Sequence, residues 1–272
     1  MRDWEYADFT AAVHRLTGID LTAYNERQMK RRIDSFILRN RCQNYSDYYR
    51  AISSDRGSLK KFSDFITINV TEFFRNPLQW EKLRSDILPE LMKLRGPMKI
   101  WSSACSTGEE PYSLVLLLNR FMNLNAIHIL ATDIDEGAIA KARQGVYLQN
   151  SLKNLPEGYT EKYFDCRKDG YHIKEKVKAC VEFRKLNLLK DPYPKGCHLI
   201  LCRNVMIYFT QEAKDRMYQR FHDALLPGGI LFLGNTEQIL NPVKYGLVSL
   251  RSFFYSKTIE KSTSLTERVG NQ

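Results

Sequence analysis

The sequence lacks the paired ligands from which structural metal sites are usually built. Its six cysteines include no C-x-x-C pair, and its five histidines form no H-x-x-H or H-E-x-x-H pattern. These spacings are typical of zinc sites, so we expect no metal in this protein. Because the chain shows no secretory signal, we expect reduced and mostly buried thiols rather than a disulfide framework.

Long hydrophobic runs are missing as well. Residues 114–118 form an apolar run of only five, whereas a helix that crosses a membrane needs about 20 apolar residues. The first 16 residues carry charges throughout and lack the apolar segment of a signal peptide. Hydrophobic residues make up 43% of the chain and charged residues 26%, which is typical of a globular protein. We therefore expect a cytoplasmic monomer with no membrane insertion.

Three common enzyme motifs are also absent. The chain contains no G-x-G-x-x-G fingerprint, no Walker A lysine and no G-x-S-x-G elbow. Without these motifs, the sequence offers no standard dinucleotide-binding turn, no P-loop phosphate site and no nucleophilic serine of the α/β-hydrolase type.

Acidic residues are scarce near the N-terminus, so the charge is distributed unevenly. The formal net charge is +10, and residues 24–61 contain ten Lys or Arg against four Asp or Glu. Nucleic acid, an anionic membrane and an acidic protein are all attracted by such a surface, and charge alone does not choose among them.

Residues 1–68 are predicted to be helical. Met29, Ile33, Phe36 and Ile37 recur at helical spacing and indicate one buried stripe. Basic residues project from the opposite side of this helix. A solvated face is the ordinary role of such residues, but we favour a binding face because few acids are interleaved. The candidates for substrate recognition are Arg27, Lys30, Arg31 and Arg41.

A connector at residues 69–97 includes an expected helix at 77–94, which starts at a proline. From residue 98 onward, strands and helices alternate, which is typical of a mostly parallel sheet with helices on both faces. The expected strands are 98–103, 127–132, 181–186, 198–202 and 229–234, and the expected helices are 110–123, 136–143 and 211–225.

Three later segments depart from this alternation. Residues 144–180 are polar and contain Lys168-Asp169-Gly170, a hairpin signal, so we expect a small inserted subdomain there. Residues 247–255 are expected to form a final antiparallel strand pair. The polar residues 257–272 are expected to be disordered.

The segment "SSACSTGEEPYS", residues 102–113, places small residues and Gly108 between an expected strand and an expected helix. In an open α/β sheet, such a turn can let a nucleotide lie against the backbone. The alternative is a purely structural turn that connects the strand to the helix. Asp133 stands at the end of the next strand, where an acid can hold a ribose. The alternative for Asp133 is a helix cap, which Asp135 can also provide.

A third strand, at residues 198–202, runs directly into Arg203 and Asn204. These residues would lie at the carboxyl edge of the sheet. A structural ion pair is the alternative for Arg203, and ordinary core packing is the alternative for Tyr208 and Phe209.

Five motifs occur along the chain: "NVTEFFR" (69–75), "ACSTGEEPYS" (104–113), "ATDIDEGAIAKARQGVY" (131–147), "CRNVMIYF" (202–209) and "LLPGGILFLG" (225–234). In this order they resemble the chemotaxis receptor glutamate methyltransferases, the CheR-type family. The resemblance covers all but the C-terminal tail. It implies an all-α N-terminal domain followed by a Rossmann-like class I methyltransferase sheet at residues 98–256, with a small antiparallel β insertion at 144–180.

The resemblance also implies S-adenosyl-L-methionine as the cofactor and S-adenosyl-L-homocysteine as the product. Glu109 would accept from the cofactor's ammonium group, and Asp133 would hold its ribose. Arg75 and Tyr208 match the pair next to the reacting centre. The implied cofactor-binding residues are Asn69, Thr71, Arg75, Glu109, Asp133, Asn187, Leu188, Arg203 and Asn204.

The implied reaction methylates glutamate side chains on the cytoplasmic domains of methyl-accepting chemotaxis receptors, for sensory adaptation. A glutamate has an unperturbed pKa of about 4.3, so it is ionised at neutral pH and needs no general base. One alternative is a nucleic-acid methyltransferase, which we disfavour because "RNVMIYF" stands where an N-P-P-[YF]-like pocket would be expected. The other is a non-catalytic module that senses the cofactor or docks a partner.

In some relatives, the edge of the inserted hairpin binds a tethering peptide from the receptor's C-terminus as an added strand. This chain has a compact hairpin, and Lys174, Lys176 and Lys178 are expected to protect its edge. We therefore expect this protein to work without the peptide.

Overall fold

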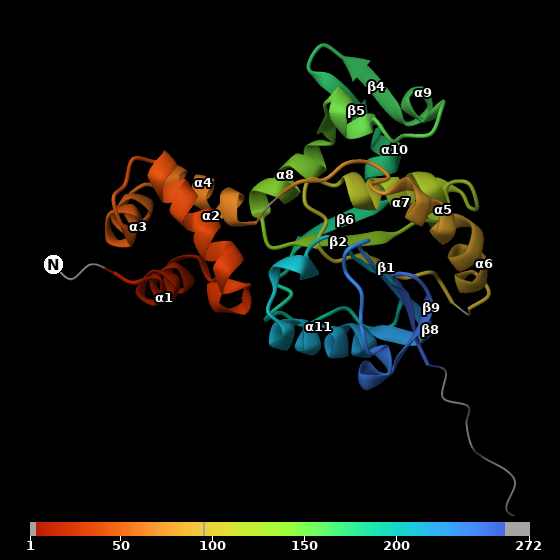
Figure 1. The fold of residues 1–272 in the computed structure, drawn as a ribbon. Helices are drawn as coiled ribbons and strands as arrows, with labels where there is room; N and C mark the ends of the chain where they lie inside the picture. The colour runs from red at the N-terminus through yellow and green to blue at the C-terminus, as the bar shows by residue number, and fades with distance from the viewer. Residues whose placement is uncertain (1–3, 68, 95, 259–272) are drawn as a thin grey trace, which may run out of the picture.

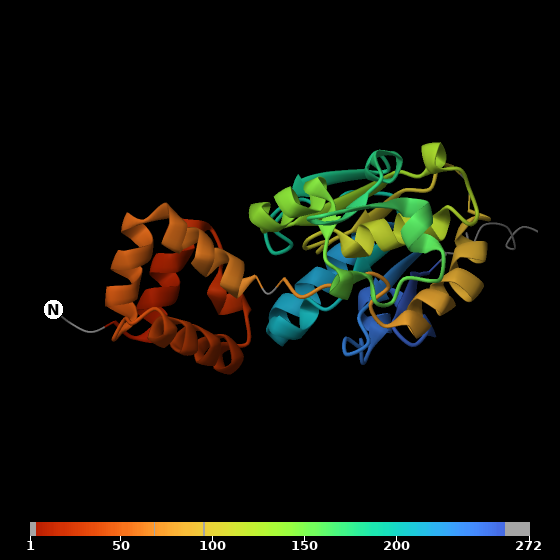
Figure 2. The same cartoon turned by 90° about the horizontal axis from the view of Figure 1, so that it is seen from above.

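The computed structural model describes residues 4–67, 69–94 and 96–258, which form two parts (Figure 1). A group of helices gathers at one end, and a sheet with helices on both faces forms the larger part (Figure 2). Residues 259–272, most of the tail expected to be disordered, lie outside the described residues. No helix in these ranges combines the length and apolar character needed to cross a membrane.

Residues 4–67 form four α-helices and a short 3-10 helix around one core. Asn25 caps α2 by accepting from the backbone N–H of Gln28. Three residues of the predicted stripe are buried, whereas Phe36 is half-buried and stacks on Phe65. The elements are α1 (Tyr6–Thr17), η1 (Leu21–Ala23), α2 (Glu26–Arg39), α3 (Tyr45–Ser54) and α4 (Arg56–Ile66).

The larger sheet has seven strands within the described residues, in the order β6-β2-β1-β7-β8-β10-β9. The first five are parallel, and the last two pair antiparallel, as the sequence predicted. The strands are β1 (Ile100–Ser102), β2 (Ile129–Asp133), β6 (Val181–Lys185), β7 (Cys197–Cys202), β8 (Leu225–Leu233), β9 (Leu247–Arg251) and β10 (Phe254–Lys257).

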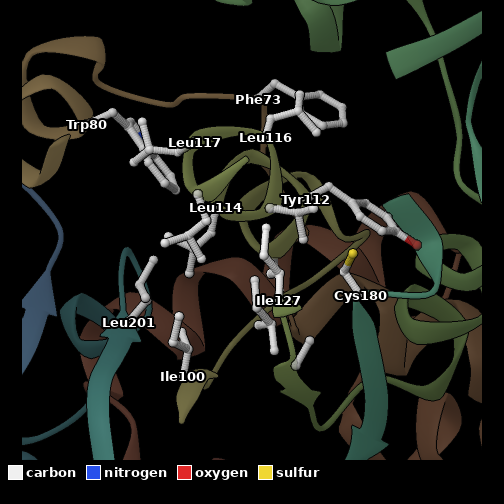
Figure 3. Close-up of a cluster of buried hydrophobic side chains, with 14 of the residues drawn as sticks. Phe73, Trp80, Ile100, Tyr112, Leu114, Leu116, Leu117, Ile127, Cys180 and Leu201 are labelled. Carbon is white, nitrogen blue, oxygen red and sulfur yellow. The ribbon is translucent and has the colours of Figure 1, made fainter. Parts of the chain in front are cut away.

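The two faces of this sheet bury different side chains, because successive strand residues point to opposite faces. Leu201 of β7 packs in the cluster that includes α7, whereas Ile200 packs in the cluster that includes α11. Figure 3 shows Ile100 and Leu201 facing Leu114 of α7. The expected helices are confirmed as α7 (Glu109–Leu118), α8 (Glu136–Gln144) and α11 (Gln211–Ala224). All six cysteines are free and four are buried, as predicted.

The single helix expected at residues 77–94 is interrupted. It consists of α5 (Pro77–Lys82), the π-helical segment η2 (Leu83–Ile87) and α6 (Leu88–Leu91). Pro89 has no N–H to donate to the carbonyl of Ser85, so one regular helical hydrogen bond is missing at the junction.

The inserted subdomain contains a three-stranded antiparallel sheet in the order β3-β5-β4, as predicted. Its hairpin turns between β4 and β5 at Lys168-Asp169. The elements of this segment are β3 (Val146–Tyr147), η4 (Gln149–Leu152), α9 (Tyr159–Tyr163), β4 (Phe164–Arg167), β5 (Gly170–Ile173) and α10 (Glu175–Lys178).

The expected role of the three lysines in this subdomain is wrong. Lys174 caps α10 and donates to two carbonyls of α9, while Lys176 and Lys178 lie within α10. The chain after β5 turns into a helix, so these side chains do not line a strand edge. The two edge strands are β3 and β4, and β4, the edge strand of the hairpin, carries the exposed Asp165 and Arg167.

The helical part docks onto the sheet through the segment that precedes α2. The N–H of Asn25 donates to the carbonyl of Tyr208 at 2.8 Å, and the N–H of Thr210 donates to the carbonyl of Ala23 at 2.8 Å. Tyr24 and Phe209 form an isolated β-bridge between these two bonds. The start of α2 is thereby held next to η5 (Met206–Tyr208), which follows β7. The remaining short elements are η3 (Leu124–Ala126) and η6 (Pro242–Tyr245).

Candidate active site

A cavity opens at the carboxyl ends of the parallel strands. Residues that follow β1, β2, β6 and β7 form its wall together with the connector before α5. The predicted site residues on the wall are Asn69, Thr71, Arg75, Asp133, Asn187, Leu188, Arg203, Asn204 and Tyr208.

The turn between β1 and α7 brings small side chains to this wall. Ser103, Ala104 and Ser106 line the cavity, so a ligand can approach the backbone. Gly108 has a φ of 96°, and a Cβ there would lie 2.9 Å from the Cβ of Ala142. Glycine is therefore required at the start of α7 by both its backbone conformation and its close neighbours.

Among the predicted catalytic and cofactor-binding residues, Glu109 is the one that does not line the cavity. Its carboxylate accepts from the hydroxyl of Thr107 at 2.7 Å. The next residue, Glu110, lines the cavity and accepts from the hydroxyl of Ser102 at 2.8 Å. Adjacent helical residues point about 100° apart, so the two carboxylates point in different directions, and Glu110 is the one on the cavity wall. Burial raises the pKa of both carboxyls.

Asp133 lies at the end of β2, where the sequence predicted it. Its carboxylate accepts from the backbone N–H groups of Ser106 at 2.8 Å and Asp135 at 3.0 Å. Burial raises the pKa of Asp133. The helix cap is Asp135, which accepts from the N–H groups of Gly137 and Ala138 at the start of α8. Asp133 is thereby free of capping and faces the cavity.

Asn69 links the connector to these strand ends. Its amide donates to Asp135 at 2.6 Å, and its carbonyl oxygen accepts from the hydroxyl of Ser106 at 3.0 Å. These bonds hold the start of the "NVTEFFR" segment against the β1 turn.

Arg203 forms the ion pair that the sequence left as an alternative. Its guanidinium lies 3.4 Å from the carboxylate of Glu110, and both side chains are buried. The same guanidinium lies over the rings of Phe232 and Trp80, at 4.7 Å and 5.4 Å from the centroids. Burial lowers the pKa of Arg203, while the Glu110 carboxylate opposes that shift.

This ion pair also fixes the backbone of Arg75. The carbonyl of Arg75 accepts from the guanidinium of Arg203 at 2.8 Å and from the indole N–H of Trp80 at 3.0 Å. Phe74 and Asn76 on either side have φ values of 48° and 60°, a left-handed conformation that non-glycine residues adopt at some cost. Two side-chain hydrogen bonds therefore hold Arg75 at the cavity wall.

Sequence reasoning missed Arg32 of α2. Burial raises the pKa of Tyr208, and the charges of Arg32 and Arg75 oppose this shift. The guanidinium of Arg32 is fixed because it donates to the carbonyl of Phe65 at 2.9 Å. The detectable signal was its position beside Ile33, on the flank of the buried stripe. By contrast, the predicted recognition residues are all exposed: Arg27, Lys30, Arg31 and Arg41.

Sequence reasoning also missed Glu237, which lies after β8. Its buried carboxylate accepts from the N–H groups of Asn204 and Met206, each at 2.7 Å, and of Gly234 at 2.8 Å. These bonds fix the loop between β7 and η5 that carries Asn204 and Tyr208. The only sequence signal was an acid shortly after a buried strand.

The wall fits S-adenosylmethionine. Asp133 can accept from ribose hydroxyls, the small turn residues admit a chain, and Glu110 offers a carboxylate to an ammonium group. In the described ranges, no group of three or more His, Cys, Asp or Glu side chains is placed to hold a metal ion. A parallel sheet that ends in an antiparallel strand pair, with such a cavity at its carboxyl edge, defines a Rossmann-like class I methyltransferase that binds S-adenosylmethionine.

The chain belongs to the CheR methyltransferase family. Residues 69–254 match the family model described as "CheR methyltransferase, SAM binding domain". Residues 4–67 match "CheR methyltransferase, all-alpha domain".

Several curated relatives align over most of their length. The chain is 43% identical to "Chemotaxis protein methyltransferase" of Listeria innocua over 255 residues, which cover 93% of this chain and 97% of that protein. It is 33% identical to "Chemotaxis protein methyltransferase 1" of Pseudomonas aeruginosa, covering 88% and 92% of the two chains. It is 32% identical to "Chemotaxis protein methyltransferase" of Borreliella burgdorferi, covering 84% and 85%.

Proposed function

We propose that this protein transfers the methyl group of S-adenosylmethionine to the side-chain carboxylates of specific glutamates on methyl-accepting chemotaxis receptors. It would act in the cytoplasm, and its products would be glutamate methyl esters and S-adenosylhomocysteine, for sensory adaptation. The observation that carries this proposal is that Arg75 and Tyr208 line one cavity with Asp133 and Asn187. The names of the curated relatives support a chemotaxis protein as the acceptor.

The side chains beside the reacting centre suit a carboxylate acceptor. The cofactor supplies an electrophilic methyl group on a sulfonium. A guanidinium can hold a carboxylate by two parallel hydrogen bonds, which we assign to Arg75. Burial raises the pKa of Tyr208, so its hydroxyl stays protonated and donates to the acceptor. Because a tight grip on the ground state would slow attack, we assign Arg75 to orientation rather than strong binding.

The cofactor contacts in this proposal follow the cavity wall. Asp133 holds the ribose, and Glu110 takes the ammonium contact that the sequence assigned to Glu109. The other proposed contacts are Asn69, Thr71, Arg75, Asn187, Leu188, Arg203 and Asn204.

Methyl transfer from labelled cofactor tests the proposed acceptor class. The protein is incubated with S-adenosylmethionine labelled in the methyl group, together with receptor-containing membranes or with RNA. We expect label on protein that mild base releases, because a methyl ester hydrolyses. Label on RNA would select a nucleic-acid methyltransferase, and no label on either would select a non-catalytic module.

We further propose that Arg27, Lys30, Arg31 and Arg41 recognise the receptor, whose methylation helices the family resemblance implies to be acidic. Arg27→Glu combined with Arg31→Glu is expected to raise the receptor KM about tenfold or more and to leave cofactor Kd unchanged. Individual exposed pairs contribute little, roughly 0–1 kcal/mol, but several charges together steer association. Arg50→Glu on α3 is the control, because Arg50 is also an exposed arginine of the same part of the chain. Receptor binding that does not weaken with salt would count against this role.

We also propose that the protein methylates receptors without a tethering peptide. The support is the two-residue turn of the hairpin and the charged edge of β4, since charges oppose strand addition. Titration with a receptor-tail pentapeptide is expected to show no saturable binding. Micromolar binding that is lost on mutation of Asp165 and Arg167 would overturn this expectation.

A further inference from the structure

The helical part of the molecule supplies one wall of the cofactor cavity. Three of its residues line the cavity: Tyr24, Ile66 and Thr67. The one hydroxyl hydrogen of Thr67 already has acceptors within the protein, the carboxylate of Asp135 at 2.9 Å and the carbonyl of Ser63 at 3.0 Å. Tyr24 is therefore the residue of this wall with a polar group left to offer.

The position of Tyr24 is fixed by the contact between the two parts. Its ring centroid lies 4.8 Å from that of Phe209. The two interdomain backbone hydrogen bonds, from Asn25 to Tyr208 and from Thr210 to Ala23, flank it on either side. The half-buried ring of Tyr24 is thus held at the carboxyl edge of the sheet, although Tyr24 belongs to the helical part, between η1 and α2.

The hydroxyl of Tyr24 has no hydrogen-bond partner among residues 4–67, 69–94 and 96–258. Burial raises its pKa, and the nearby charges of Asp133 and Asp20 raise it further, so the group stays protonated and can donate. Tyr24 and Asp133 line the same cavity, and Asp133 ends β2, where the ribose is proposed to lie. A protonated donor that lines a cavity with no protein acceptor suits a bound molecule with exposed oxygen or nitrogen acceptors.

We propose that Tyr24 is part of the cofactor site, and that its hydroxyl donates to the nucleoside half of the bound cofactor. The helical part of the chain therefore completes the site that the methyltransferase sheet begins. This inference rests on the cofactor half of the proposed function and is independent of the acceptor.

One consequence is a coupling between cofactor binding and docking of the helical part. Because Tyr24 lies between the two interdomain hydrogen bonds, a ligand that contacts it stabilises both. By linkage, cofactor binding and domain docking then favour one another. The start of α2, and with it the exposed basic face, is held more firmly when the cofactor is bound.

The affinity for S-adenosylhomocysteine tests the contact between Tyr24 and the cofactor. The measurement is made without receptor, so its result does not depend on whether the proposed receptor substrate is correct. Calorimetry on Tyr24→Phe is expected to show a Kd raised roughly 3- to 10-fold, as for loss of one hydrogen bond. Tyr24→Ala, which also loses the ring, is expected to raise it further. Tyr49→Phe is the matched control: Tyr49 is a half-buried tyrosine of the same part that packs on Trp4 and should leave Kd unchanged.

Hydrogen exchange provides a second test. The quantity measured is the difference in amide exchange with and without ligand, which a loss of stability alone would not remove. In the wild-type chain, S-adenosylhomocysteine is expected to slow exchange at the amides of Asn25 and Thr210, and Tyr24→Ala should abolish this ligand-dependent protection. An unchanged Kd in Tyr24→Phe, together with no ligand-dependent protection at Asn25, would overturn the proposal.

Discussion

Arg75→Ala is expected to lower the kcat of methyl transfer about 100-fold or more while leaving the thermal midpoint nearly unchanged. Loss of one preorganised donor beside a reacting centre typically costs about 10²–10³ in rate. The backbone of Arg75 is held through its carbonyl, so truncation of the side chain leaves those two hydrogen bonds in place. The side chain makes one further bond, from its guanidinium to the carbonyl of Val70 at 2.8 Å.

Tyr208→Phe is the companion variant. It keeps the ring and removes only the hydroxyl, which makes no hydrogen bond within the described residues, so the effect should again fall on kcat. Single-turnover rates with receptor membranes measure both variants. Arg84→Ala is the control, because Arg84 is an arginine on the neighbouring helix that pairs with Glu81. Full methyl transfer by either active-site variant would remove that residue from the proposed mechanism.

Glu110→Ala is expected to destabilise the protein by about 3–5 kcal/mol. Removing one member of a buried ion pair leaves the other charge without compensation, and costs of that size are typical. The side chain of Arg203 is 2% exposed and that of Glu110 is 10% exposed, so the pair is largely removed from bulk water. The hydroxyl of Ser102 would lose its acceptor as well.

Urea unfolding of the variant measures this loss. The control is Lys93→Ala, because Lys93 and Glu90 form an ion pair whose side chains are 68% and 65% exposed. That variant should change the free energy of unfolding by less than about 1 kcal/mol. Replacing both Glu110 and Arg203 with methionine is expected to recover part of the loss, since no unpaired charge then remains. A cost below 1 kcal/mol for Glu110→Ala would show that the pair does not stabilise the fold.

The sheet and its helices could be predicted because their hydrophobic patterns are local. The run at residues 199–202 is apolar on both faces, and the structure buries β7 on both faces. The same reasoning placed Asp133 at a strand end and left Asp135 for the cap. The family resemblance, rather than periodicity, supplied the identities of the cofactor-binding residues.

The features that could not be predicted depend on which way a side chain points, or on contacts between segments far apart in the sequence. Sequence spacing does not say which of Glu109 and Glu110 faces the cavity, because the rotation of α7 is set by its packing. The roles of Glu237 and Tyr24 come from segments that meet only in the folded chain. Lys174, Lys176 and Lys178 alternate in the sequence as strand residues do, so they were expected on a strand edge. They lie instead at the start of α10 and within it.

Mass spectrometry of receptor membranes treated with this protein and S-adenosylmethionine tests the central claim most directly. The account predicts methyl esters on the side chains of particular receptor glutamates. These esters should disappear after mild base treatment and should be missing when Arg75→Ala replaces the wild-type chain. Methyl groups that resist base on lysine, arginine or nucleic acid, with receptor glutamates unmodified, would contradict it.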